Sequence, residues 1–212
     1  MKRITPILIL IITVAVAATT IDAAKRGKHH KRVRHHRVTY VAPAVPEAKK
    51  GLFVVVSKSD LTLKVYKSSN GDTVLIDNFP VCVGRGLGNK QRRGDHRTPE
   101  STVNKPFKIV QISDSRTWRH NFHDGRGKIL AYGHWYMRLN TPISNQIGIH
   151  GSTNNEESVP GRASDGCIRM RDDDLVTFKD KYAYVGMPVI VKSEKQGLFP
   201  WERKTSRSPN PN

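Results

Sequence analysis

Apolar and polar residues alternate over short distances through the middle of the chain. The run LFVVVS from Leu52 is almost continuously apolar, whereas LTLKVYK from Leu61 alternates, and both patterns are typical of β-strands. The pair Asn70-Gly71 separates the second run from TVLIDNFPVCVG and predicts a tight turn. The chain therefore begins its regular structure at about Gly51 with consecutive strands.

Further strands follow, with a single clear helix. The strand-like segments are PFKIVQIS from Pro106, HWYMRL from His134, QIGIHG from Gln146 and MPVIVK from Met187. In RDDDLVTFKDKYAYV, Leu175, Phe178 and Tyr182 fall on one helical face, and three aspartates at its start complement the helix dipole. The pattern predicts a mainly β domain over residues 51–192 with one or two short helices.

Three segments have no regular pattern. Residues 84–99 are rich in Gly and Arg and predict a mobile loop, and residues 114–133 are polar and aromatic, as in a flexible flap. The flap holds His120 and His123, and its substrate-lining role is an open alternative to surface placement. Residues 193–212 contain three prolines and many charges, and predict a flexible C-terminal tail.

The N-terminal residues indicate the compartment. Lys2 and Arg3 precede an apolar run, residues 4–18, and small residues follow, which is the layout of a secretory signal. The run is short against the ~20 residues that span a bilayer, although an uncleaved anchor is the alternative. Residues 1–24 are therefore expected to direct export to the periplasm or cell envelope.

A basic segment follows the signal. Eleven of the thirteen residues in 25–37 are Lys, Arg or His, which predicts a disordered arm, and residues 38–50 read as a Pro/Ala linker. The whole chain has 36 Lys and Arg against 18 Asp and Glu, so an anionic cell-envelope polymer is a candidate partner of the arm; a solvated spacer is the alternative. Nucleic acid is not expected, because no aromatic residues interleave the basic ones. A monomer is expected.

The chain has two cysteines in contrasting surroundings. Cys82 lies within an apolar strand-like run, whereas Cys167 lies in SDGCIRM among polar residues and glycine. In an oxidising compartment the two could form a disulfide. The contrast favours two separate roles, a buried inert thiol and an accessible reactive one.

His150 and Cys167 are candidates for nucleophilic catalysis. A nucleophilic thiol needs a base and donors for the developing oxyanion. His150 ends a strand, and residues 152–163 are long enough to return Cys167 to it. Gly166 permits a close backbone approach, and its amide and that of Cys167 could form an oxyanion hole. A zinc site is not expected, because the spacing holds no paired ligand motif, and no metal or cofactor is required.

The residues around this pair belong to a longer pattern. IHG, a spacer and SDGCIRM together resemble the active-site signature of the L,D-transpeptidase family, the YkuD-type domain that remodels bacterial peptidoglycan. FPVCVGRG, GDHRTPE and VGMPVIV also fit, so that the resemblance covers about residues 52–192. It implies a β-sandwich-like mixed sheet. Two positions depart from the family pattern: Asp165 stands where many members have histidine, and Ser101 stands where glycine is usual.

The resemblance also implies roles for single residues. Cys167 matches the nucleophile, His150 the general base, and Gly151 the residue whose carbonyl orients the imidazole. Gly166 and Ser164 match the oxyanion turn, which also contains Asp165, and Arg169 matches the polar position two beyond the cysteine. Apart from the resemblance, the candidate substrate-binding residues are Arg169, whose planar fork suits a carboxylate, His134, which could face the site from the neighbouring strand, and Ser152.

The implied activity is that of an L,D-transpeptidase. The enzyme would cleave peptidoglycan stem tetrapeptides through a thioacyl-enzyme, release D-alanine and form 3→3 crosslinks. Hydrolysis of the thioester would make it an L,D-carboxypeptidase. A non-catalytic envelope-binding module that keeps the same fold is the alternative from another class.

Overall fold

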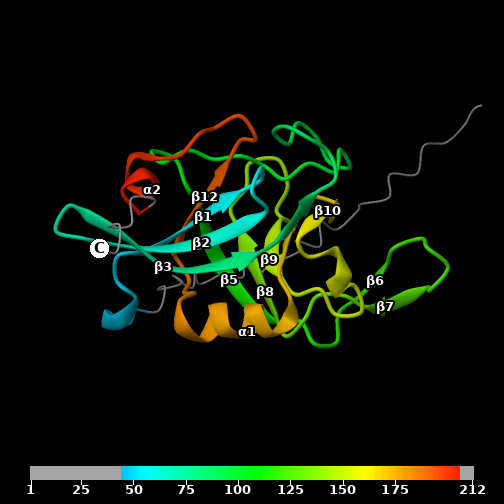
Figure 1. Ribbon diagram of the computed structural model, residues 1–212. Coiled ribbons are helices and arrows are strands. Elements are labelled where there is room, and N and C mark those ends of the chain that lie inside the picture. Colours follow the sequence, from blue (N-terminus) through cyan, green and yellow to red (C-terminus); the bar gives the residue numbers. More distant parts are fainter. Residues whose placement is uncertain (1–43, 206–212) are drawn as a thin grey trace, which may run out of the picture. The chain divides into compact units, whose positions relative to one another are not determined.

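The computed structural model describes residues 44–205 (Figure 1). The expected signal peptide, the basic arm and residues 206–212 lie outside the described residues. Within residues 44–205, no helix is both long enough and apolar enough to cross a membrane.

A ten-stranded mixed sheet and a separate two-stranded hairpin make the domain mainly β, as predicted. The strand order of the large sheet is β10-β4-β11-β9-β8-β5-β12-β1-β2-β3. Its strands are β1 (Leu52–Ser57), β2 (Thr62–Ser69), β3 (Asp72–Pro80), β4 (Cys82–Gly84), β5 (Phe107–Asp114), β8 (Trp135–Leu139), β9 (Gly148–His150), β10 (Gly161–Ser164), β11 (Ile168–Arg169) and β12 (Pro188–Lys192). The hairpin consists of β6 (Arg119–Asn121) and β7 (Lys128–Leu130); the helices are η1 (Glu47–Lys49), η2 (Glu156–Ser158), α1 (Asp172–Lys181) and α2 (Pro200–Thr205).

The turn and the helix predicted from the sequence are both present. Asn70 and Gly71 join β2 to β3 with φ of 51° and 85°, the left-handed values that a two-residue hairpin turn requires. Leu175 and Phe178 on α1 are fully buried. Phe178 meets Phe79 of β3 edge to face, with ring centroids 6.1 Å apart, so α1 packs against the sheet.

The central strand β1 is buried on both faces. Val54 and Val56 belong to the main core with α1, whereas Val55 points to a second cluster that includes Ile190 of β12 and Phe199. Figure 1 shows α1 and α2 at different sides of the sheet. Because alternate residues of β1 are apolar on both faces, each face needs a cover, and α2 supplies the second one.

The expectation of a flexible tail from residue 193 is wrong for residues 193–205. Phe199 is buried in the second cluster, and the buried carboxylate of Glu202 accepts hydrogen bonds from Lys192 Nζ at 2.9 Å and the Phe199 amide at 2.8 Å. Composition could not reveal this packing, since Glu202 reads as a surface charge until its buried partner is known. The linker likewise ends in the fold, since Lys49 Nζ donates to the Asp180 and Ala183 carbonyls at the end of α1.

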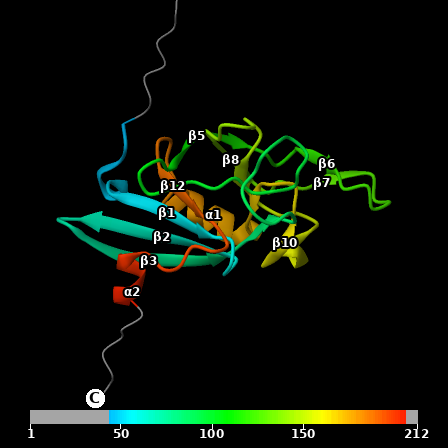
Figure 2. The same cartoon turned by 90° about the horizontal axis from the view of Figure 1, so that it is seen from above.

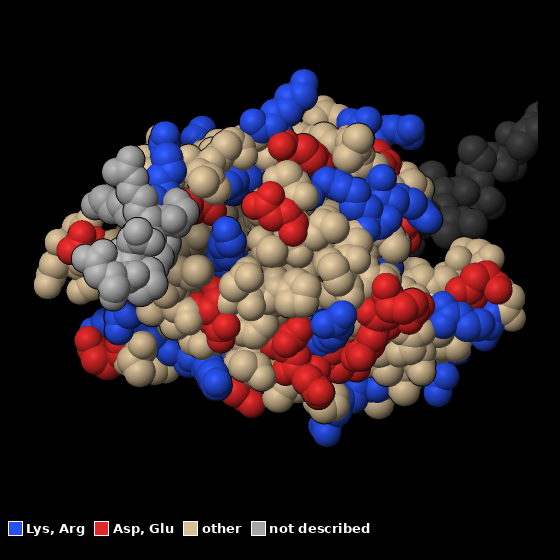
Figure 3. All heavy atoms as spheres, viewed as in Figure 1, with Lys and Arg blue, Asp and Glu red and all other residues tan. Residues whose placement is uncertain are grey.

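The segments expected to be irregular are organised by hydrogen bonds. Residues 119–130 form the β6–β7 hairpin, which extends away from β1–β3 in Figure 2. In loop 84–99, the Asp95 carboxylate accepts bonds from Lys90 Nζ and the Gln91 amide. In Figure 3, basic side chains gather on the upper side where this loop lies, and acidic ones on the lower side near α1.

Candidate active site

His150 and Cys167 come together because their strands are neighbours. β9 and β11 pair in parallel, with Ile149 opposite Ile168 and His150 opposite Arg169. Cys167 immediately precedes β11 and, by the same register, lies beside Gly148, two positions before His150 on β9. Both side chains line a cavity of about 60 Å³. His150 and Cys167, which are seventeen positions apart in the sequence, are thus brought to the same cavity by two neighbouring strands.

The imidazole of His150 is held in one orientation. Its ring is 3% exposed, and Nδ1 lies 2.7 Å from the Gly151 carbonyl oxygen. Since a carbonyl only accepts, Nδ1 carries the proton and Nε2 is a free base. The ring stacks on Tyr136 with centroids 5.5 Å apart and tilts against Tyr132 at 4.8 Å. Burial, together with the nearby charge of Arg169, lowers the pKa of His150 to about 3, so the imidazole is neutral at neutral pH.

The Gly151 carbonyl that orients the ring is positioned by close backbone contact between Gly151 and Gly133. The Gly151 amide donates to the Tyr132 carbonyl at 2.8 Å, and a Cβ on Gly151 would lie 2.6 Å from the Gly133 Cα. Asp172, at the start of α1, accepts from the next amide, that of Ser152, at 2.8 Å. Only glycine fits at position 151, and α1 fixes the loop that carries the carbonyl.

Cys167 is half-buried, and its thiol contacts groups other than His150. Sγ lies 3.4 Å from the Gln146 carbonyl and 3.7 Å from the Tyr136 hydroxyl. Burial raises the pKa of the Cys167 thiol above its ordinary value, although bonds from the Gly148 backbone and Tyr136 oppose the shift. The resting site therefore holds a neutral thiol beside a neutral imidazole.

The turn before the cysteine is built by Ser164. Its hydroxyl donates to the Cys167 carbonyl at 2.6 Å and accepts from the Gly166 amide at 3.1 Å. Gly166 has a φ of +129°, and a Cβ there would lie 2.7 Å from the Arg97 carbonyl, so only glycine fits. Because the Gly166 amide is bonded within the turn, it is not available as the oxyanion donor expected from the sequence.

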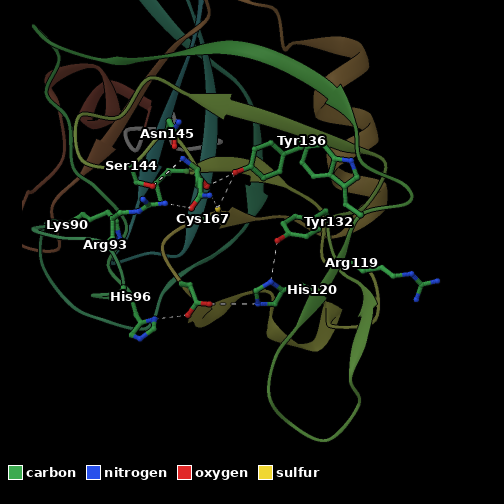
Figure 4. Close-up of a pocket in the computed structure, with 15 residues that line it drawn as sticks. Lys90, Arg93, His96, Arg119, His120, Tyr132, Tyr136, Ser144, Asn145 and Cys167 are labelled. Carbon is green, nitrogen blue, oxygen red and sulfur yellow. Dashed lines mark hydrogen bonds and ion pairs between the residues drawn. The ribbon is translucent and has the colours of Figure 1, made fainter. Parts of the chain in front are cut away.

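Asp165 joins the turn to two flanking segments. Its exposed carboxylate lies 2.5 Å from Arg85 Nη2 and 2.7 Å from His96 Nδ1 on loop 84–99. His120 Nε2 on β6 lies 4.0 Å away on the other side. Dashed lines in Figure 4 mark contacts of His96 and His120 in this cluster. The residue that departs from the family pattern is therefore a bridge between the loop and the hairpin.

A second, larger cavity of about 770 Å³ is also lined by Cys167 (Figure 4). It shares Cys167, Asp165, His120 and Tyr132 with the small cavity, and His150 lines only the small one. Its lining is Lys90, Arg93, Gly94, His96, Trp118, Arg119, His120, Tyr132, Tyr136, Ser144, Asn145, Gln146, Ile147, Asp165 and Cys167. The side chain of Arg119 points away from Cys167 in Figure 4.

The structure separates the remaining candidates. Arg169 is buried and lines the small cavity. His134 is exposed and lines neither cavity. Ser152 is fully buried, and its hydroxyl donates to the Met170 carbonyl at 2.9 Å, so its contacts are structural. Tyr136 and Gln146 were not predicted as site residues, because they contact the thiol only through the pairing of β8 with β9 and the loop between these strands.

Both cysteines are free, so the disulfide that the sequence left open is absent. Cys82 is fully buried on β4, and its sulfur accepts from the Ala163 amide at 3.2 Å. Among residues 44–205, no three His, Cys, Asp or Glu side chains are grouped as they would be around a metal ion.

The arrangement is that of a mixed-sheet domain with a candidate thiol–imidazole pair in a cavity. The family model of the L,D-transpeptidase catalytic domain, YkuD, matches residues 52–191. The chain therefore belongs to this family. A search of curated protein sequences finds no match.

Solved structures that align with TM-scores of at least 0.50 share the fold. The structure of Bdellovibrio bacteriovorus Bd1075 aligns with a TM-score of 0.51 and 17% identity over 79% of this chain and 58% of that one. The helical cell shape determining protein Pgp2 from Campylobacter jejuni aligns with a TM-score of 0.50 and 18% identity over 73% of this chain and 52% of that one. An L,D-transpeptidase from Mycobacterium smegmatis aligns with a TM-score of 0.45 and 21% identity over 68% of this chain and 59% of that one. The chain thus spans between half and three fifths of the length of these proteins.

Proposed function

We propose that the protein is a cysteine-dependent L,D-transpeptidase that acts on peptidoglycan stem tetrapeptides. One observation carries the proposal: a free, half-buried thiol and an imidazole with an unprotonated Nε2 line the same cavity. Membership of the L,D-transpeptidase family supports the substrate class.

In the first half-reaction, His150 Nε2 takes the proton of the Cys167 thiol. The sulfur attacks the carbonyl of the L-centred third residue of the stem, and the bond to the terminal D-alanine breaks. His150 returns the proton to the leaving amine. The products are free D-alanine and a thioester on Cys167. The Cys167 amide is the proposed donor to the oxyanion that forms during the attack, because the Gly166 amide is bonded to Ser164.

In the second half-reaction, the side-chain amine of a neighbouring stem attacks the thioester. His150 takes the proton of the amine and returns it to the departing sulfur, so that a 3→3 amide crosslink and the free thiol result. Water in place of the amine yields a tripeptide, and the enzyme is then an L,D-carboxypeptidase. The two outcomes use the same residues and differ only in the acceptor.

The test is the reaction of the purified protein with a disaccharide tetrapeptide, followed by mass spectrometry. A dimer that has lost one D-alanine supports transfer, and a tripeptide supports hydrolysis. Cys167→Ala is expected to abolish both products, while Cys82→Ala, which changes the buried sulfur, retains them. Absence of product from the unaltered protein would favour the envelope-binding module.

Export and tethering complete the proposal. Residues 1–24 would direct the chain out of the cytoplasm, and residues 25–37 would hold it near anionic envelope polymers. Replacing residues 25–37 by a neutral sequence of equal length is expected to lower retention on isolated sacculi at low salt. Equal retention of both forms would contradict the tethering role.

A further inference from the structure

The two cavities define a direction for the substrate. They meet at Cys167, and His150 lines only the smaller one. The leaving amine must take its proton from His150, so whatever follows the scissile bond has to enter the smaller cavity. The stem on the acyl side of that bond then extends into the larger cavity, beside Tyr136 and Gln146. This reasoning rests on the proposed function.

The smaller cavity contains a buried cation without an acidic partner. Arg169 is 5% exposed and lines this cavity. Its guanidinium carbon lies 5.3 Å from the ring centroid of Phe122, which follows β6. With the Asn155 amide oriented to satisfy both of its neighbours, the Asn155 oxygen accepts from Arg169 Nη1 at 2.9 Å. In the described part of the chain, no carboxylate forms an ion pair with Arg169.

A buried guanidinium is costly unless an anion pairs with it, and its planar fork matches a carboxylate. The neutral contacts of Arg169 leave that match open to a ligand. Aspartate and glutamate side chains elsewhere in the fold pair with buried cations, as Glu202 does with Lys192. Arg169 differs from Lys192 in that its free face borders a cavity which also holds the catalytic pair.

The size of the cavity limits what can enter. A volume of about 60 Å³ holds roughly four to six water-sized groups at 10–15 Å³ each. That is room for one small residue such as alanine with its terminal carboxylate. Phe122 and Tyr132 also line this cavity, so an alanine methyl group that enters it meets aromatic rings.

We infer that Arg169 is a specificity-determining residue that binds the terminal carboxylate of the single residue leaving from the donor stem. The enzyme accordingly requires a free carboxylate one residue beyond the scissile bond. A donor whose terminal carboxylate is converted to a carboxamide keeps its shape and loses the charge. Such a donor lacks the ion pair and is a poor substrate.

The test compares a tetrapeptide acid with the matching tetrapeptide carboxamide. Binding is measured by calorimetry on the Cys167→Ala protein, and turnover on the unaltered protein by mass spectrometry. We expect the acid to bind about 10- to 100-fold more tightly, the range that loss of one charge-assisted hydrogen-bonded pair produces. Arg169→Gln in the Cys167→Ala background is expected to bring the ratio close to one.

Arg126→Gln is the matched control. Arg126 also lies over the Phe122 ring, at 5.5 Å, but it is exposed and pairs with Asp124, so its replacement should preserve the acid preference. Equal binding of acid and carboxamide by the Cys167→Ala protein would overturn the inference without any further variant. So would a preference that survives Arg169→Gln. An acid preference in binding that Arg169→Gln removes, without turnover by the unaltered protein, would refute the proposed function and still show that Arg169 binds the terminal carboxylate.

Discussion

The reactivity of Cys167 towards a small alkylating agent should reveal whether the resting site holds an ion pair. Burial raises the pKa of the thiol above its ordinary 9.0 and lowers that of His150 to about 3. Proton transfer between them in the resting state therefore spans at least about six pKa units, or about 8 kcal/mol. Attraction between the two new charges offsets about 4 kcal/mol at about 4 Å in a partly polar site.

The remaining cost of roughly 4 kcal/mol corresponds to about one thiolate–imidazolium pair per thousand molecules. The rate of alkylation by iodoacetamide is accordingly expected to rise continuously with pH, with no inflection below the ordinary thiol pKa of 9.0. His150→Gln should leave this profile within about twofold while it lowers turnover by about 10²- to 10⁴-fold, because the base acts only once substrate is bound.

The assay follows incorporation of iodoacetamide by intact-protein mass spectrometry from about pH 5 to about pH 9. Cys167→Ala is the control and should not react, because Cys82 is fully buried. An inflection near or below pH 7 that disappears in His150→Gln would show a preformed ion pair. That result would refute the reasoning from burial.

Three further predictions concern stability and positioning. The pKa of His150 is about 3 in the folded protein against an ordinary 6.5, so the unfolded chain binds more protons between these pH values. The free energy of unfolding should therefore fall by up to about 5 kcal/mol from pH 6.5 to pH 3. Urea titrations at several pH values should show that this free energy depends less steeply on pH in His150→Gln. Ending the chain at Gln196 leaves Lys192 buried without Glu202 and should cost about 3–5 kcal/mol, whereas ending it at residue 205 should cost little in the same titration. Gly151→Ala should lower the free energy of unfolding by about 1–3 kcal/mol, because the added Cβ forces the backbones of residues 151 and 133 apart. It should also lower kcat more than it raises KM, because the carbonyl beside His150 moves; an unchanged kcat would contradict this role.

Local patterns predicted the elements whose side chains face one core. The alternation in β2 and the helical spacing of Leu175 and Phe178 both correspond to positions in the observed packing. The pairing of His150 with Cys167 was predictable from chemistry together with the length of the loop between them. These features depend on neighbours in sequence or on the requirements of one reaction.

Contacts set by distant segments left no local trace. In the sequence, Glu202 has the pattern of a solvent-exposed charge. It is buried because its helix packs on the second apolar face of β1, and the pattern of a strand does not show which segment packs on each of its faces. His134 immediately precedes β8 and is exposed, because it lies in the bend before the strand, where the alternation of the strand does not yet direct side chains towards the site. Tyr136, two residues further on, contacts both His150 and Cys167 instead.

The parallel pairing of β9 with β11 has a consequence for how much this domain can vary. The register of the two short strands sets the separation of the imidazole and the sulfur, whereas the connecting residues 151–167 support the side chains around them, for example through the Gly151 carbonyl and Ser164. An insertion at an exposed position of this connection that bonds none of the site residues should leave the reacting atoms in place. The number of residues between the histidine and the cysteine can therefore differ among related sites. A search for such sites should require the parallel pairing of the two strands rather than a set spacing in the sequence.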